Sequence, residues 1–299
     1  MTTATAQATT ARPVVEVVTG IRTLEGAGFP VRRPFPTAGL LQVDPFLLLD
    51  HLGPVQWGPG EGVGAPDHPH RGFETVTYLL SGEMEHKDSV GHRGRLGPGD
   101  VQWMTAGAGV VHSELPSARF MRAGGVMHGF QIWVNLPVRD KMTRPRYQDI
   151  PAARIPAAAS GDGKIKVRVI AGAALGKSAV IETHTPIIYL HFTLAPGAEV
   201  VQPVPQDHNA LVYVFAGEAR AGDERRTVRE GQLARFGGGE AVRLAAAPDA
   251  AAPAQLLLLA GRPLNEPIAR HGPFVMNTQQ EIVQAIRDYQ EGRMGKIEF

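Results

Sequence analysis

Four side chains in the first half of the chain have the types and spacing of a metal site. His68 and His70 are two residues apart, and His112 and Glu114 repeat that spacing. On an extended strand, residues two apart point to the same face, so each pair can direct both side chains at one point. Two such pairs on facing strands would bring three nitrogen atoms and one oxygen atom together. That ligand set suits a divalent first-row metal and leaves coordination positions open.

A second carboxylate competes with Glu114 for the role of oxygen ligand. Glu74 follows His70 at an even spacing, so on a continuous strand it would face the same side as the two histidines. The residues alone leave both carboxylates open. A single histidine is more often a surface or hydrogen-bonded residue than a ligand. Two strand-spaced pairs beside glycine-rich turns are harder to explain by packing, and they favour a metal site.

Composition narrows the chemistry and the cell compartment. The chain has no cysteine, which excludes thiolate ligands and cysteine nucleophiles, and which suits a reducing cytoplasm. Its 30 basic and 29 acidic residues give a net charge of +1, and without a long basic run we expect no direct nucleic-acid binding. The sequence contains no run of ~18 apolar residues, so it predicts no membrane span. We expect a cytoplasmic protein that does not bind a membrane.

The elements that must position these residues are predicted to be short strands. The 35 glycines and 24 prolines separate short apolar segments, a pattern typical of an all-β chain. Residues 14–19 are expected to form a first strand and residues 127–136 a further long one, and a second strand-rich region covers residues 164–260. One helix is expected near the end. Thr278 and Glu281 form a potential capping box there. The apolar face of the helix would consist of Ile282, Ile286 and Tyr289.

The two halves share a spacing that indicates a duplicated barrel. Three residues of the first half recur in the second at a constant offset: Gly62, Tyr78 and Gly82 match Gly197, Tyr213 and Gly217. At the same offset, or after alignment of the next glycine step, non-ligand residues replace the candidate ligands. These are Pro203, Pro205, Asn209, Leu244 and Ala246. The second barrel is therefore predicted to bind no metal, and His191 and His208 are interpreted as structural or surface residues.

These patterns divide the chain into four parts. We expect a disordered tail over residues 1–13, an N-terminal metal-binding barrel over 14–138 and a proline-rich linker over 139–163. A metal-free C-terminal barrel with the terminal helix is expected over 164–299.

Four longer segments resemble a known family. HPHRGFETVTYLLSG (68–82) and GDVQWMTAGAGVVHSE (99–114) contain residues similar to the two cupin motifs. Together with HGFQIWVNLP (128–137) and GRPLNEPIARHGPFVMNT (261–278), they resemble the pirin family. The resemblance implies a bicupin, in which two antiparallel cupin-type β-barrels are followed by a short helix. It also implies that His68, His70, His112 and Glu114 are the ligands, and that Glu74 is either a partner of the ligands or an inward-facing hydrogen-bonding residue.

The resemblance implies a function as well. Pirins include enzymes that oxidise flavonols such as quercetin with dioxygen, so we expect a metal-dependent dioxygenase acting on a small aromatic substrate and O2. Glu114 would serve as the catalytic base. The family favours one Fe(II) ion, whereas ligand chemistry also accommodates Ni, Co, Cu or Zn, and affinity order favours copper or zinc.

Two other functions fit the same ligands. One is a metal-dependent, redox-sensing regulator that acts through a protein partner without turnover. The other is a small-molecule-binding barrel in which the metal only holds the fold. A substrate-sized cavity at the metal would favour the enzyme, and an exposed patch around a closed site would favour the regulator.

Several residues beside the motifs have two interpretations. Arg71 could be a structural ion-pair partner or could contact a ligand, and Gln131 in an apolar strand needs a hydrogen-bond partner. His128 is a further polar residue beside the motifs that could contact a ligand. Trp103 and Met104 could line the pocket, although core packing is the more common role.

Overall fold

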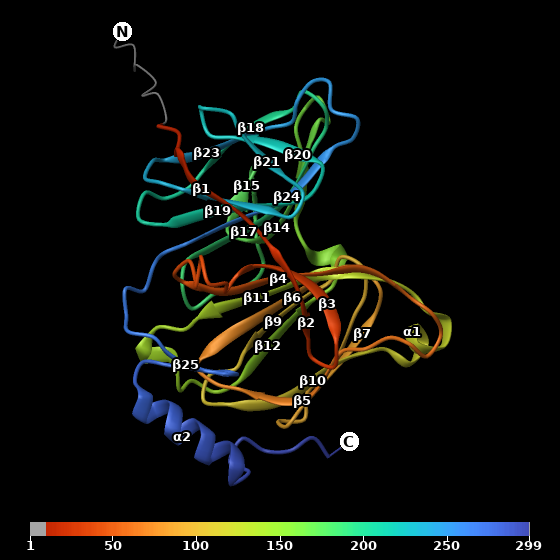
Figure 1. The fold of residues 1–299 in the computed structure, drawn as a ribbon, viewed down its shortest axis with the longest axis vertical. Helices are drawn as coiled ribbons and strands as arrows, with labels where there is room; N and C mark the ends of the chain where they lie inside the picture. The colour runs from red at the N-terminus through yellow and green to blue at the C-terminus, as the bar shows by residue number, and fades with distance from the viewer. Residues whose placement is uncertain (1–9, 299) are drawn as a thin grey trace. The chain divides into compact units, whose positions relative to one another are not determined.

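The computed structural model describes residues 10–298, which form two compact units. The N-terminal unit comprises residues 20–156, 180–186 and 263–298. The C-terminal unit comprises residues 10–19, 157–179 and 187–262. Antiparallel strands are the main elements of both units, as the short apolar segments predict (Figure 1).

The N-terminal unit is a barrel made of two antiparallel sheets. The larger sheet has the order β12-β9-β6-β11-β4-β3-β2, and the smaller has the order β5-β10-β7-β8. The bounds of the larger sheet are β2 Ile21–Glu25, β3 Phe29–Phe35, β4 Phe46–Trp57, β6 Phe73–Ser81, β9 Val101–Thr105, β11 Gly125–Asn135 and β12 Arg146–Ile150. Those of the smaller sheet are β5 Ala65–His70, β7 Met84–Asp88, β8 Arg93–Leu96 and β10 Val110–Pro116.

The C-terminal unit repeats this plan. Its larger sheet has the order β1-β22-β19-β24-β17-β14-β13, and its smaller sheet has the order β18-β23-β20-β21. The larger sheet contains β1 Val14–Thr19, β13 Ala157–Ala159, β14 Ile165–Ala171, β17 Ile187–Leu194, β19 Asn209–Ala216, β22 Gln232–Phe236 and β24 Ala254–Gly261. The smaller contains β18 Glu199–Pro203, β20 Glu218–Ala221, β21 Arg226–Arg229 and β23 Ala241–Ala245. A separate hairpin is formed by β15 Ala173–Ala174 and β16 Lys177–Ser178.

Strand by strand, the two orders are equivalent. The pair β5-β10 corresponds to β18-β23, and the run β9-β6-β11-β4 corresponds to β22-β19-β24-β17. The predicted duplication is therefore confirmed at the level of topology. Only the edge strand beside β9 in one unit and beside β22 in the other comes from a different place in the sequence. In the N-terminal unit it is β12, which follows the barrel in sequence, and in the C-terminal unit it is β1, which precedes everything else.

The ends and the centre of the chain differ from the expected division. The predicted tail lies outside the described residues over 1–9, but Ala11 bridges to Ala241, and the guanidinium group of the buried Arg12 donates to the carbonyl oxygens of Pro205 and His208. Residues 10–13 are thus ordered. The strand at 14–19 pairs with β22 and belongs to the C-terminal unit instead of the N-terminal barrel.

The expected linker over 139–163 is largely structured. It contains β12 and β13, which are edge strands of the two larger sheets, and two short 3-10 helices, Val138–Asp140 and Ala152–Arg154. Its prolines lie between these elements, because a proline at a strand end removes no hydrogen bond of the sheet.

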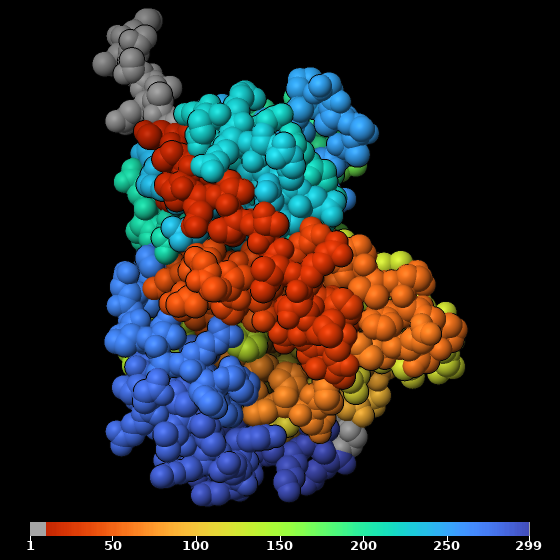
Figure 2. All heavy atoms as spheres, in the orientation of Figure 1, coloured from red at the N-terminus to blue at the C-terminus, as the bar shows by residue number. Residues whose placement is uncertain are grey.

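The terminal helix belongs to the N-terminal unit, not to the C-terminal barrel. After β24 the chain forms a hairpin of β25 Ala269–His271 and β26 Phe274–Met276, and then α2 Gln279–Gln290. The predicted capping box of Thr278 and Glu281 is present, and Ile282 is buried against Met276 and other residues of this unit. In Figure 2 these blue C-terminal residues lie beside the orange strands of the same unit.

The remaining helix, α1 Ala118–Ala123, follows β10 and is capped by the Ser117 hydroxyl group. Over residues 10–298, no helix has the length and apolar character that are needed to cross a membrane.

Candidate metal centre

Three of the four predicted ligands meet inside the N-terminal barrel. Strands β5 and β10 pair with His112 directly opposite His68, so these side chains share the inner face with His70. The ring centroids are 4.3 Å apart for His68 and His112, 4.8 Å for His70 and His112, and 4.7 Å for His68 and His70. Their candidate ligand atoms all lie within 4.8 Å of one another. We call these three residues the histidine cluster.

The cluster has the hydrogen-bonding state of a metal site. Nδ1 of His68 lies 2.7 Å from the carbonyl oxygen of Pro66, which can only accept, so Nδ1 carries a proton and Nε2 is the nitrogen that can bind a metal. Both ring nitrogens of the fully buried His112 lack a hydrogen-bond partner among the described residues. Buried polar atoms are rarely left unpaired, and a metal ion would satisfy one of these nitrogens.

The spacing of the cluster fits a metal as well. Nε2 of His68 and Nε2 of His70 are 3.0 Å apart. Two nitrogen ligands at right angles, each ~2.1 Å from an ion, would be separated by roughly that distance. The residues present therefore fit a divalent ion bound through imidazole nitrogens.

Burial also holds His70 and His112 in the protonation state that binds metals. Desolvation lowers the pKa of His70 and of His112 well below the ordinary value, and the neighbouring histidines lower both further. These imidazoles are accordingly neutral at pH 7, which is the form that offers a lone pair to a metal.

The fourth predicted ligand, Glu114, lies on the wall beside the cluster. Its carboxylate Oε1 is 2.8 Å from the hydroxyl oxygen of Thr77, and its side chain lines the same cavity as His68. Burial raises the pKa of Glu114, while the Thr77 hydrogen bond and the field of His68 act to lower it. The assignment of Glu114 as a ligand stays a prediction.

Glu74 does not face the cluster, contrary to its spacing in sequence. Its Oε1 accepts a hydrogen bond of 2.6 Å from the hydroxyl group of Thr105, whereas the side chain of Thr77, three residues on, reaches Glu114. Strand β5 ends at His70 and β6 begins at Phe73, with Gly72 between them at φ +87°. This break moves the chain from one sheet to the other and reverses the alternation, so the even spacing no longer indicates a shared face.

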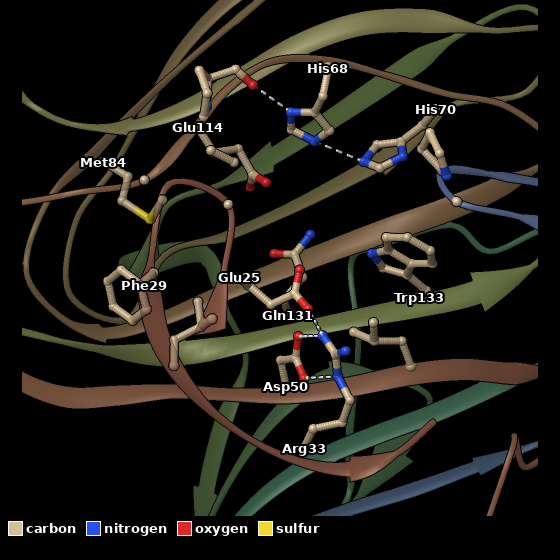
Figure 3. Close-up of a pocket in the computed structure, with 18 of the residues that line it drawn as sticks. Glu25, Phe29, Arg33, Asp50, His68, His70, Met84, Glu114, Gln131 and Trp133 are labelled. Carbon is tan, nitrogen blue, oxygen red and sulfur yellow. Dashed lines mark hydrogen bonds and ion pairs between the residues drawn. The ribbon is translucent and has the colours of Figure 1, made fainter. Parts of the chain in front are cut away.

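A cavity of about 540 Å³ opens onto the histidine cluster. Figure 3 shows His68 and His70 at one end of it and the ion pair of Arg33 with Asp50 at the other, with the indole of Trp133 along one side and Phe29 and Met84 opposite. The indole is fixed by ring contacts with His70 at 5.2 Å and with Phe73 at 4.4 Å. The guanidinium group of Arg270 lies 4.9 Å from the centre of the same indole ring.

Some residues in and around the site were not found from the sequence. His86 is directly opposite Glu114 in the pairing of β7 with β10, and its ring lies 5.0 Å from that of His112. Its Nε2 is 2.9 Å from the hydroxyl oxygen of Tyr147. Alternation in the segment MEHKD could have indicated His86. The charged residues 85 and 87 alternate with residues 84, 86 and 88, and the structure buries the latter three. Thr77, Trp133 and Arg270 carry no comparable signal.

The flanking candidates have separate roles. Arg71 donates to the carboxylate of Asp288 on α2 and is thus the structural ion-pair partner that was one of its two interpretations. Gln131 lines the cavity and contacts Thr77. His128 contacts His51, 2.8 Å away between the Nε2 atoms, and does not line the cavity. The remaining two candidates are core residues, namely Trp103 and Met104, both with no exposed surface.

The equivalent positions of the C-terminal barrel follow from the strand register. Leu244 of β23 is opposite Val200 of β18, as His112 is opposite His68, and the position of His70 is taken by Gln202. The constant offset had instead indicated two prolines, Pro203 and Pro205. It fails there because the connection from β18 to β19 is longer than that from β5 to β6. The positions equivalent to the histidines carry no imidazole.

Comparison with known proteins identifies the family of both barrels. The sequence model of pirin matches residues 28–134, and that of the pirin C-terminal cupin domain matches residues 189–295. The chain belongs to the pirin family. Its two barrels are therefore cupin domains, and the resemblance of the four sequence segments is confirmed.

Individual relatives are similar over nearly the whole chain. Human pirin is 42% identical, covering 91% of this chain and 90% of its own length. A putative quercetin 2,3-dioxygenase of Pseudomonas aeruginosa is 45% identical, with coverage of 90% and 93%. The crystal structure of quercetin 2,3-dioxygenase from Acinetobacter baumannii superposes with a TM-score of 0.88 at 38% identity, covering 96% of this chain and all of that one.

Proposed function

We propose that this pirin is a metal-dependent dioxygenase that cleaves a flavonol such as quercetin with O2. The observation that carries the proposal is the cavity of about 540 Å³ with the histidine cluster at one end and an aromatic wall at its side. Ligand pockets of drug-sized molecules are typically ~300–1,000 Å³, so a flat three-ring substrate fits this volume. Relatives described as quercetin 2,3-dioxygenases support the choice of substrate.

The metal would be held by His68, His70 and His112, with Glu114 as the fourth ligand. Fe(II) is the metal we propose, with Ni, Co, Cu and Zn as the alternatives that the same ligands accommodate. When bound, such an ion supplies Lewis acidity to the hydroxyl and carbonyl groups of the substrate and brings substrate and dioxygen together.

The residues of the chain bind, orient and deprotonate the substrate. Trp133 lies along its flat face, and Phe29 and Met84 exclude water from the opposite side. Glu114 accepts the proton of the substrate hydroxyl group at a carboxylate oxygen, because a ligand carboxylate lies within reach of a substrate bound at the metal. The reaction then places both atoms of O2 in the products as the ring opens with loss of carbon monoxide.

The regulator without turnover remains the second candidate. A closed site surrounded by an exposed patch would have favoured it, whereas the cavity at the histidine cluster favours an enzyme. We therefore place the regulator second, together with the purely structural metal.

Aerobic turnover of quercetin by the iron-reconstituted protein tests the proposal. We expect bleaching of the flavonol absorbance with uptake of one O2 per flavonol and release of carbon monoxide. The metal-free protein and His112→Ala are the controls, and both should be inactive while remaining folded by circular dichroism. One bound metal per chain without turnover would refute the flavonol dioxygenase and favour the regulator.

A further inference from the structure

The hydroxyl group of Thr77 lies between two oxygen atoms that cannot both be its acceptors. Its Oγ1 is 2.8 Å from Oε1 of Glu114 and 2.7 Å from Oε1 of Gln131. A threonine hydroxyl group has one proton and can donate only one hydrogen bond. Thr77 is only 2% exposed, so a water molecule does not take the place of either contact. One of the two contacts must run in the opposite direction.

Two directions satisfy all three groups. In the first, the Gln131 amide is turned by half a turn, so that its NH2 group donates to Thr77 and Thr77 donates to Glu114. The oxygen and nitrogen of a glutamine amide are assigned from such networks, so the distances permit this orientation. In the second, Glu114 keeps a proton and donates to Thr77, which donates to the oxygen of Gln131.

Only the first direction leaves Glu114 as a carboxylate. A metal ligand must be deprotonated, and so must a general base. The strand register supports a permanent contact, because Gln131 of β11 is directly opposite Thr77 of β6, which places both on the inner face. The pair therefore holds the Glu114 side chain from the rigid larger sheet.

We propose that Gln131 donates to Thr77, that Thr77 donates to Glu114, and that the Gln131 oxygen, turned into the cavity, accepts a hydroxyl group of the substrate. Gln131 is thus a specificity-determining residue, and Thr77 is a positioning residue for Glu114. Both parts rest on the proposed function, because the direction follows from Glu114 as ligand and base, and the Gln131 contact concerns the substrate of the same site. Gln131 lines the cavity between the histidines and the ion pair of Arg33 with Asp50, so its free oxygen meets a hydroxyl group of the substrate that lies beyond the metal-binding end.

This direction selects the chemistry of the substrate. An acceptor in the cavity wall favours a substrate that offers a hydroxyl proton and disfavours the same ring carrying hydrogen at that place. The opposite direction would present an NH2 donor, which favours carbonyl or ether oxygen atoms instead. A neutral hydrogen bond of this kind corresponds to roughly a five- to tenfold difference in affinity.

The direction can be measured without any substrate. In the zinc-loaded protein, the side-chain amide signals of Gln131 are identified by NMR from their loss in Gln131→Met. We expect one of its two protons to exchange with water roughly five- to tenfold more slowly than the other, because it is hydrogen-bonded to Thr77. Thr77→Val, which has the same shape without the hydroxyl group, should remove this difference, and Thr77→Ser should restore it. Equal exchange of both protons in the unmodified protein would overturn the proposal.

The substrate part is tested by anaerobic titration with two flavonols. 3-Hydroxyflavone and quercetin share the metal-binding end and differ in their other hydroxyl groups. We expect the zinc-loaded protein to bind quercetin more tightly, and Gln131→Met to reduce that preference roughly five- to tenfold. An unchanged preference in Gln131→Met would overturn the selective role of Gln131.

The two measurements separate this proposal from the proposed function. If neither flavonol binds, the flavonol substrate is refuted, and the Gln131 protons still decide the direction of the hydrogen bonds. If quercetin is turned over while those protons exchange equally, the dioxygenase stands and the hydrogen-bond direction is refuted.

Discussion

The two barrels share one strand order and differ in what fills them. In the C-terminal barrel the inward positions form a continuous apolar core that includes Val200, Leu244 and Ala246. At the equivalent positions the N-terminal barrel carries imidazoles and a carboxylate, and its interior opens into a cavity. The topology therefore does not determine the chemistry. A few inward side chains decide whether a cupin interior contributes packing or a binding site.

The largest expected effect separates the histidines of the two barrels. His70→Ala should abolish stoichiometric metal binding. The loss of metal affinity should exceed the ~10–100-fold that is typical when a residue hydrogen-bonded to a metal ligand is removed. His208→Ala is the matched control in the C-terminal unit, where Nδ1 of His208 lies 2.8 Å from Asp207, and metal content should not change. Metal analysis of both purified proteins is the measurement. Full metal retention in His70→Ala would remove the ligand assignment, and loss in His208→Ala would show a site in the second barrel.

A second comparison uses equivalent positions in the two interiors. Leu244→Ala should lower the free energy of unfolding by ~2–5 kcal/mol, because it leaves a cavity in a close-packed apolar core. His112→Ala in the metal-free protein should cost less. Removal of that ring also removes two buried nitrogens without partners, whose burial is itself unfavourable.

Urea unfolding of the metal-free variants, followed by fluorescence and circular dichroism, makes this comparison. Equal losses for the two variants would mean that the N-terminal interior is as well packed as the C-terminal one.

The smallest expected effect concerns a buried charge of the N-terminal unit. The ammonium group of Lys141 donates to the carbonyl oxygens of Gly72 and Val275 and to the side-chain oxygen of Asn135. Desolvation lowers its pKa from 10.5 to about 8. Between these two values the unfolded chain binds more protons than the folded one, so this group makes the protein more stable as pH rises.

Comparison with Lys141→Met isolates the contribution of this residue. The difference in unfolding free energy between the two proteins should move in favour of the unmodified protein by up to ~3 kcal/mol from pH 7.5 to pH 10.5. A difference that stays constant over this range would show that the Lys141 pKa is not lowered.

Local patterns account for the parts of the site that could be predicted. The two histidines of β5 and the pair on β10 were found because alternation within a strand is a property of neighbouring residues. The same rule gave the wrong face for Glu74, since Gly72 interrupts the strand and no pattern marks where the chain changes sheets. The capping box of α2 was recognised for the same local reason.

Long-range pairing explains what the sequence did not reveal. β1 pairs with β22, and β12 pairs with β9, through register that only the folded chain defines. Neither strand carries a mark of its partner, so one was assigned to the wrong barrel and the other to a linker. Thr77 and Gln131 became part of the site only through cross-strand pairing.

The return of the last segment to the N-terminal unit has a consequence for synthesis of the protein. Arg270 and Pro273 line the cavity, and the backbone of Phe274 bridges to Arg71 beside the histidine cluster. Domains generally fold in order as they leave the ribosome, but this one lacks part of its wall until residues 263–298 have been translated. The first barrel to emerge is thus the last to be finished. A chain released early would carry all four candidate ligands and still present an unfinished pocket.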